Sequence, residues 1–162
     1  MEIWDAYDEN FNKVDGVTLI RDEEIPDGYY HLVSEIIVRH TDGTYLMMQR
    51  DFRKHLGGKW ELTAGGSALQ GEDSLACAIR ELREETGIAT NNLVRVGCVQ
   101  HCGYKTFYEI YMCITDIPKN RIILQEGETS SYNWVSVDEL SKMPIETFAS
   151  VRFQQFIEEF KR

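Results

Sequence analysis

A single well-marked helix constrains the fold of this chain more than any other feature of its sequence. The pattern predicts this helix over residues 73–86, because Asp73 or Ser74 can cap its N-terminus and Gly87 can end it. A helix with one narrow apolar stripe must pack that stripe against another layer, which neighbouring strands can provide. The apolar stripe, at about 100° per residue, comprises Leu75, Ala78, Ile79 and Leu82.

The same helix carries three glutamates on a second face. Glu81, Glu84 and Glu85 stand at i, i+3 and i+4, roughly 125° from the apolar stripe, so we expect them to stay accessible. Like charges at this spacing weaken a helix by a few tenths of a kcal/mol per pair, and the helix dipole disfavours anions in the last turn. Hard cations such as Mg²⁺ or Mn²⁺ favour such oxygen-rich clusters. The alternative is a solvated acidic face.

Strands and helices alternate along the rest of the chain, which predicts one mixed α/β layered domain. The first two strands are expected to form a hairpin around the turn at residues 41–43. Gly65 and Gly66 are expected to begin a loop, in which glycine permits positive φ and close approach to a metal or phosphate. The expected strands cover residues 31–39, 44–50, 60–63, 93–101, 106–114 and 132–135. A helical turn over 137–142 and a closing helix over 145–161 follow, the latter with apolar positions Phe148, Val151, Phe156 and Phe160.

Residues 1–30 differ in pattern from the rest. Two short extended pieces, near residues 4–7 and 17–20, are separated by turn-forming residues, and a loop through residues 26–28 follows. We expect an N-terminal β-hairpin extension over residues 1–30 and the main domain over residues 31–162. Such a hairpin could also pair with a second copy by strand addition, so a homodimer is a candidate state.

The charge balance bears on possible partners. The 162 residues carry a net charge of −10, because 27 acidic side chains outnumber 17 basic ones. This argues against a nucleic-acid partner, and a phosphate-bearing substrate would then be attracted by a bound cation. No stretch approaches the ~18 consecutive apolar residues of a membrane span, and the first residues lack the regions of a secretory signal. We expect a cytoplasmic protein with no membrane partner.

Four cysteines are few for this length, and none lies in a CxxC pair. Reduced, buried thiols are therefore expected. A zinc site at Cys98, His101, Cys102 and Cys113 is the alternative. On one strand, however, Cys98 and Cys102 would lie about 13 Å apart, which is too far for a single metal.

The segment from Gly66 to Ile88 matches the pattern GX5EX7REUXEEXGU, where U is a bulky aliphatic residue. Its seven fixed residues would coincide by chance on the order of 10⁻⁸ times per start position. The chain therefore resembles the Nudix hydrolases. The resemblance implies an α/β/α sandwich around a mixed β-sheet, in which the box forms a loop, a helix and a loop. Flanking pieces at 48–50, 58–61 and 133–140 also resemble the family.

The resemblance also implies roles for the residues of the box. In the family the box holds one or more Mg²⁺ ions against a diphosphate, and Glu72 and Arg80 match positions that support the acidic cluster through a mutual ion pair. The matching metal ligands are Glu81, Glu84, Glu85 and the carbonyl of Gly66. The implied reaction is attack of water on phosphorus in a nucleoside diphosphate linked to another group, with Mg²⁺ or Mn²⁺ lowering the pKa of water.

A carboxylate must then accept the proton from that water. Many members of the family use a residue in the loop before the last strand, which here covers residues 125–132. Glu128 is the first candidate for this base and Glu126 the second. Glu81, within the box, is the fallback.

Basic and aromatic residues near the box are candidates for holding a small-molecule diphosphate. Arg50, Arg53, Lys54 and Lys59 flank the approach to the box and can meet phosphates. Tyr104, like nearby Phe107, can stack on a base. The alternatives are solvated surface charge for the basic residues and core packing for the aromatic ones.

The N-terminal region resembles a narrower group, the Nudix proteins related to type 1 isopentenyl-diphosphate isomerases. His31 matches a metal-binding histidine of those isomerases, and Glu109 lies near their second catalytic residue. Gly65, however, replaces their catalytic cysteine, and Ser67 replaces their next histidine. The resemblance therefore implies an isomerase-like scaffold that performs hydrolysis. The alternatives are an isomerase-like enzyme and a sensor that binds metal and nucleotide without turnover.

Overall fold

Strand β3 (His31–His40) is the central strand of the main sheet. The computed structural model describes residues 1–150, 152, 156, 158 and 159. Within them, β3 runs parallel to β8 (Thr106–Thr115) along its whole length and antiparallel to β4 (Tyr45–Arg50) and β6 (Ala64–Ser67). The sheet is therefore mixed, as the sequence predicts.

The other strands extend this sheet on both sides. Strand β7 (Val94–His101) pairs with β8, and both β5 (Trp60–Glu61) and β9 (Thr129–Val135) pair with β4, all antiparallel. The predicted hairpin of β3 and β4 exists, but its register joins only Arg39 and Tyr45. Beyond that point the two strands diverge, because β6 pairs with β3 while β9 pairs with β4.

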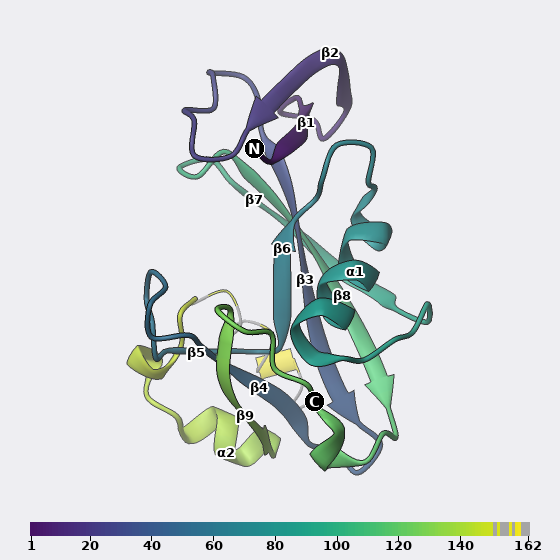
Figure 1. The fold of residues 1–162 in the computed structure, drawn as a ribbon, viewed down its shortest axis with the longest axis vertical. Coiled ribbons are helices and arrows are strands. Elements are labelled where there is room, and N and C mark those ends of the chain that lie inside the picture. The colour runs from purple at the N-terminus through teal and green to yellow at the C-terminus, as the bar shows by residue number, and fades with distance from the viewer. Residues whose placement is uncertain (151, 153–155, 157, 160–162) are drawn as a thin grey trace.

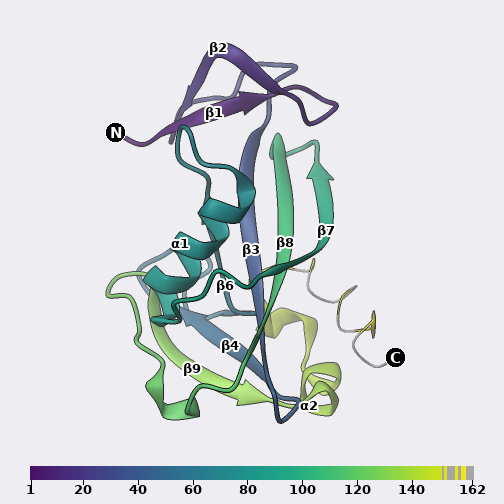
Figure 2. The ribbon, with the colours of Figure 1, turned by 90° about the vertical axis from the view of Figure 1, so that its right-hand side faces the viewer.

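Helices cover the two faces of the sheet, which gives the predicted α/β/α sandwich (Figure 2). Helix α1 (Ser74–Thr86) packs on one face through Ala78 and Leu82. Helix α2 (Val137–Lys142) packs through Leu140 into a second cluster, which includes Ile37 and Ile110 on the opposite face. Two short 3-10 turns, Lys119–Arg121 and Ile145–Thr147, are also present, and residues 152, 156, 158 and 159 are helical.

Helix α1 begins and ends where the sequence predicts. The side chain of Asp73 accepts a hydrogen bond from the Ala76 amide at 2.8 Å, and Gly87 ends the helix in the left-handed region. The buried face differs from the predicted stripe, because α1 packs on β6 as well as on β3. The buried face of α1 is therefore turned toward its glutamates, so that Glu85 is buried and Leu75 is exposed.

Gly65 and Gly66 do not begin a loop, and that prediction is wrong. They lie in β6, which pairs with β3 from Ala64 to Ser67, and their φ angles are not positive. A side chain does approach Gly66 closely, because a Cβ there would lie 2.3 Å from the carboxyl carbon of Glu81, whereas the approach of a metal or phosphate stays a prediction. Glycine is therefore required here to let the Glu81 carboxylate reach the backbone of β6.

An N-terminal hairpin of β1 (Ile3–Tyr7) and β2 (Lys13–Ile20) forms a separate two-stranded sheet at one end of the molecule (Figure 1). It has its own small core of Trp4, Ala6 and Leu19. Two backbone hydrogen bonds of 2.9 Å between Tyr7 and Tyr30 join it to the chain that enters β3. The hairpin is present as predicted, and the division of the chain into 1–30 and 31–162 stays a prediction.

The closing helix predicted from residue 145 is wrong for its first residues. Only a 3-10 turn follows Pro144, and Phe148 then adopts extended backbone and forms a β-bridge with Trp60. Burial of Phe148 against the sheet competes successfully with helix formation there. Phe156 is buried and helical, whereas Val151 and Phe160 lie outside the described residues.

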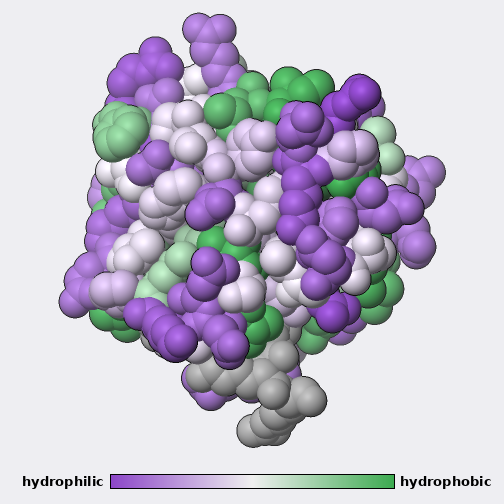
Figure 3. All heavy atoms as spheres, turned by 90° about the horizontal axis from the view of Figure 1, so that it is seen from below, coloured by the Kyte–Doolittle hydropathy of each residue, from purple (hydrophilic) through white to green (hydrophobic). Residues whose placement is uncertain are grey.

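Hydrophilic and hydrophobic residues are interspersed on the face seen from below in Figure 3. Within the described part of the chain, no helix is both long and apolar enough to cross a membrane.

Candidate active site

A cavity of about 470 Å³ lies between α1, β6 and the N-terminal hairpin. The helix provides four charged residues of the box, and β6 provides the two glycines and Ser67. Loops that follow β4 and precede β9 provide further charged side chains. The lining residues with chemical functions are Glu2, Trp4, Arg21, Asp22, Lys54, Ser67, Arg80, Glu81, Glu84, Glu85, Gln125 and Glu128.

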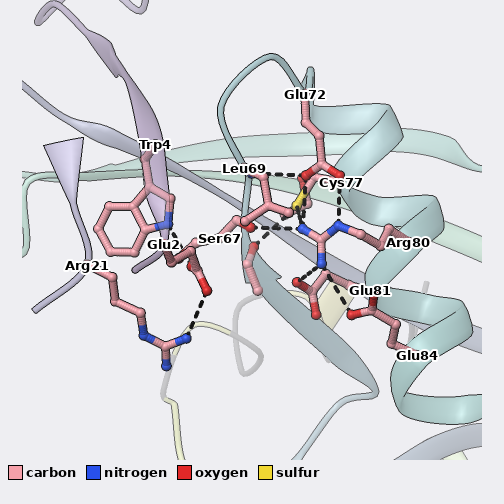
Figure 4. Close-up of polar contacts among 12 residues, drawn as sticks. Glu2, Trp4, Arg21, Ser67, Leu69, Glu72, Cys77, Arg80, Glu81 and Glu84 are labelled. Atoms are coloured by element: carbon pink, nitrogen blue, oxygen red, sulfur yellow. Dashed lines mark hydrogen bonds and ion pairs between the residues drawn. The ribbon is translucent and has the colours of Figure 1, made fainter. Parts of the chain in front are cut away.

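Arg80 organises the carboxylates of the cavity (Figure 4). Its Nε and Nη2 donate to the two oxygens of Glu72 at 2.7 and 2.9 Å. Its Nη1 donates to Glu81 at 2.6 Å and to Glu84 at 3.2 Å, and Nη2 also reaches the carbonyl of Ser67 at 3.0 Å. The guanidinium therefore connects the start of the box, the helix and β6, and the implied ion pair between Glu72 and Arg80 is present.

Glu85 differs from the other carboxylates of the cavity. It is only 6% exposed, yet no hydrogen bond or ion pair joins it to another described residue. Burial raises the pKa of Glu85 well above its ordinary value, and the nearby charges of Glu61 and Glu81 raise it further. A buried carboxylate that faces a cavity without a protein partner is suited to a cation.

Glu81 and Glu84 complete the donor set. Glu81 is half-buried, and burial raises its pKa, whereas Glu84 is exposed at the rim. In the described part of the chain, no three acidic, thiol or imidazole side chains already surround one point. Arg80 holds Glu81 and Glu84 at its own guanidinium instead, so a bound cation would compete with Arg80 for their oxygens.

The loop before β9 brings Glu128 to the cavity but not Glu126. Glu128 forms an ion pair with Lys54, and its carbonyl accepts a hydrogen bond of 2.9 Å from the Asp51 amide. Glu126 is exposed. Of the two predicted loop bases, Glu128 is therefore the one that faces the acids of α1.

Residues 30–156 match the NUDIX domain family. The chain belongs to the Nudix family. The uncharacterized Nudix hydrolase lmo0368 of Listeria monocytogenes is 33% identical over 146 residues, which covers 88% of this chain and 85% of that protein.

Solved structures share this Nudix fold. The crystal structure of DR0079 from Deinococcus radiodurans superposes with a TM-score of 0.78 at 18% identity, and the match covers 99% of this chain and all of that one. The Nudix domain of Shewanella oneidensis NrtR, solved with ADP ribose, gives a TM-score of 0.64 at 17% identity. That match covers 82% of this chain and 86% of that one.

Several residues that were predicted to hold the substrate do not line the cavity that the described residues of this Nudix protein form. Arg50 pairs with Glu61 at 2.6 Å, Arg53 pairs with Asp51 at 2.8 Å, and Lys59 does not line the cavity. Tyr104 is exposed and stacks on His101, whereas Phe107 is buried. Among these basic and aromatic candidates, Lys54 alone lines the cavity formed by the described residues.

The two residues that match the isomerases, His31 and Glu109, contact other side chains of the fold. The His31 ring stacks on Trp4 at 4.4 Å between centroids and bonds to Thr106, and burial lowers its pKa. Glu109 is buried, pairs with Arg95, and does not line the cavity. The isomerase-like subgroup therefore stays a prediction.

The expectation of four buried thiols is wrong in part. Cys77 and Cys113 are buried, but Cys98 and Cys102 are exposed. Cys98 lies on β7, an edge strand that pairs only with β8 among the described strands, and Cys102 lies in the turn after it.

Four lining residues from the hairpin were not found by sequence reasoning: Glu2, Trp4, Arg21 and Asp22. No local pattern marks them, because their place at the cavity depends on how the hairpin docks against the box. Glu61, whose charge acts on Glu85, was missed for a similar reason, since β5 brings it close only through the sheet.

Replacing Glu72 by alanine should lower the free energy of unfolding by about 1–3 kcal/mol. Arg80 and the Leu69 amide, which donates at 2.9 Å, would both lose an acceptor. Because Arg80 lowers the pKa of Glu72, the difference from wild type should be full at neutral pH and shrink as acid protonates Glu72. Denaturant unfolding measures the change. An equal effect of Glu23→Ala, an exposed control, would contradict this role.

Proposed function

We propose that this Nudix protein hydrolyses a diphosphate bond in a nucleoside diphosphate linked to another group, using Mg²⁺ or Mn²⁺. The observation that carries this proposal is the buried carboxylate of Glu85, which faces the cavity beside Glu81 and Glu84 and has no hydrogen-bond or ion-pair partner among the described residues. The donor set is composed of oxygens, which hard cations prefer. The intact box supports the same conclusion.

We assign different roles to the residues that line the cavity. Glu81, Glu84 and Glu85 would hold the metal, together with the carbonyl of Gly66 on β6. When bound, the metal would neutralise charge on the diphosphate and lower the pKa of water. Arg80 is not a ligand in this scheme. It orients Glu81 and Glu84 and ties them to Glu72.

Glu128 is the proposed general base. It lines the same cavity as the acids of α1 and would accept the proton of the attacking water at a carboxylate oxygen. Lys54, its ion-pair partner, would hold this carboxylate in position. Glu126 and Glu81 are the alternatives. Glu128→Gln should therefore lower kcat far more than Glu126→Gln.

The direct test is a broad screen of diphosphate compounds with Mg²⁺, followed by product analysis in ¹⁸O-labelled water to locate the phosphorus attacked. We expect steady release of product that Glu84→Gln reduces at least tenfold and that the exposed control Glu23→Gln leaves unchanged. Tight nucleotide binding without turnover in the wild type would contradict the proposal and support the sensor. The cytoplasmic location and the homodimer stay predictions.

A further inference from the structure

The cavity has a second wall, which the Nudix box does not provide. Glu2, Trp4, Arg21 and Asp22 of the N-terminal hairpin line it; we call these four residues the hairpin wall. Figure 4 shows Glu2, Trp4 and Arg21 on one side of Ser67 and the Arg80 cluster on the other. The hairpin wall and the charged residues of the box therefore line one continuous cavity, so both can contact the same compound.

The hairpin is fastened to the loop that begins the box. The carbonyl of Ile3 accepts a hydrogen bond from the Gln70 amide at 2.9 Å, and Asp5 accepts one from the Gly71 amide at 2.8 Å. Trp4 is buried and stacked on His31. The hairpin wall is thus held in place relative to the box by backbone bonds and by packing.

The side chains of the hairpin wall are also ordered among themselves. The indole Nε1 of Trp4 donates to Glu2 at 2.7 Å, and Arg21 donates to the other oxygen of Glu2 at 3.1 Å. The Arg21 side chain remains 58% exposed, and no hydrogen bond from a described residue reaches the side chain of Asp22. Arg21 keeps donors for a ligand, while Glu2 and Asp22 offer acceptors.

The charges of the lining residues indicate which kind of ligand the hairpin wall can bind. Glu2 and Arg21 neutralise each other, so Asp22 leaves the hairpin wall with a negative charge. Among the described residues that line the whole cavity, six carboxylates outnumber three cationic side chains. The carboxylates are those of Glu2, Asp22, Glu81, Glu84, Glu85 and Glu128, and the cations are Arg21, Lys54 and Arg80. Metal at the box would offset the carboxylates of the helix but not those of the hairpin. A third phosphate would meet like charge there, whereas hydroxyl groups would find both acceptors and donors.

We infer that the hairpin wall binds an uncharged, hydroxyl-bearing group, such as a sugar, attached to the diphosphate of the substrate. The inference rests on the proposed function and narrows it. The protein selects diphosphate-linked sugars and discriminates against nucleoside triphosphates. Asp22 and Glu2 accept hydrogen bonds from hydroxyls of the sugar, and Arg21 donates to its oxygens.

The test combines binding and turnover. The binding probe is the α,β-methylene analogue of ADP-ribose, measured by calorimetry with Mg²⁺, and the turnover substrates are ADP-ribose and ATP. Asp22→Asn and Arg21→Ala should each weaken binding of the analogue about tenfold and raise KM for ADP-ribose to match. KM for ATP should stay unchanged or fall with Asp22→Asn, because a like charge is removed. Arg121→Ala, an exposed arginine elsewhere, is the control.

Each result has a separate meaning. Asp22 is exposed and makes no described hydrogen bond, so Asp22→Asn should fold normally, which thermal unfolding checks. Unchanged binding of the analogue, or an equal loss for ATP, would overturn the inference even if hydrolysis is normal. Hairpin-dependent binding without any hydrolysis would overturn the proposed function and leave the inference standing.

Discussion

Glu85→Gln should abolish turnover and at the same time raise the melting temperature of the metal-free protein. Glu85 is buried beside Glu61, Glu81 and Glu128, whose charges raise its pKa, while Lys54 acts in the opposite direction. Without a cation, an ionised carboxylate there costs desolvation and repulsion, and an amide of the same shape removes both costs. With the cation, the same substitution removes a ligand, so we expect kcat/KM to fall at least a hundredfold, or about 2.7 kcal/mol.

The sign of the pH dependence follows from the raised pKa of Glu85. A group whose pKa is higher in the folded state destabilises that state as pH rises above the ordinary value for glutamate. The gain in melting temperature from Glu85→Gln should therefore be small in acid and grow toward pH 8. Calorimetric unfolding in EDTA at several pH values measures it.

Glu84→Gln is the matched control for this prediction. Glu84 is exposed and hydrogen-bonded to Arg80, so its replacement should lower activity without raising the melting temperature. A fall in melting temperature for Glu85→Gln, or retained turnover, would contradict the assignment of Glu85 as a metal ligand that has no partner among the described residues. Mg²⁺ should stabilise the wild type and not the Glu85→Gln variant.

The sequence predicts those parts of the fold that local signals determine. Asp73 and Gly87 mark the ends of α1 because their capping interactions are made within a few residues. The parallel pairing of β3 with β8 has no such local signal, since it joins residues about 75 positions apart in the chain. At Phe148 a local signal was misleading. The spacing of apolar residues predicts a helix there, but Phe148 forms a β-bridge with Trp60 instead.

The candidate site likewise contains some residues that the sequence predicts and others that it does not. Glu81, Glu84 and Glu85 could be predicted because one helix spaces them, and Arg80 with Glu72 because the box fixes their separation. The hairpin wall could not be predicted, because Arg21 reaches the cavity only after the hairpin docks on the box loop. Among the basic residues, only the tertiary structure shows that Arg50 is engaged by Glu61, whereas Lys54 faces the cavity.

Gly66→Ala should cost little stability and most of the activity. An added Cβ would lie 2.3 Å from the Glu81 carboxyl carbon, much closer than the 3.4–4 Å of an ordinary contact. The obstacle is the flexible end of a side chain, so Glu81 can move away without unfolding the protein. Its carboxylate would then leave the position beside β6 and Arg80, and we expect kcat/KM to fall about a hundredfold or more.

Substitutions at two other glycines separate this effect from general destabilisation. Gly65→Ala would bring a Cβ within 2.9 Å of the Ser34 carbonyl oxygen, which is backbone and cannot rotate away, so it should destabilise the protein by about 1–3 kcal/mol. Gly97→Ala, whose Cβ would only meet Phe156 at 3.7 Å, should change neither property. If Gly66→Ala kept normal turnover, the close approach of Glu81 to β6 would serve packing alone. A large loss at unchanged melting temperature would instead show that the glycine is needed for the position of a carboxylate.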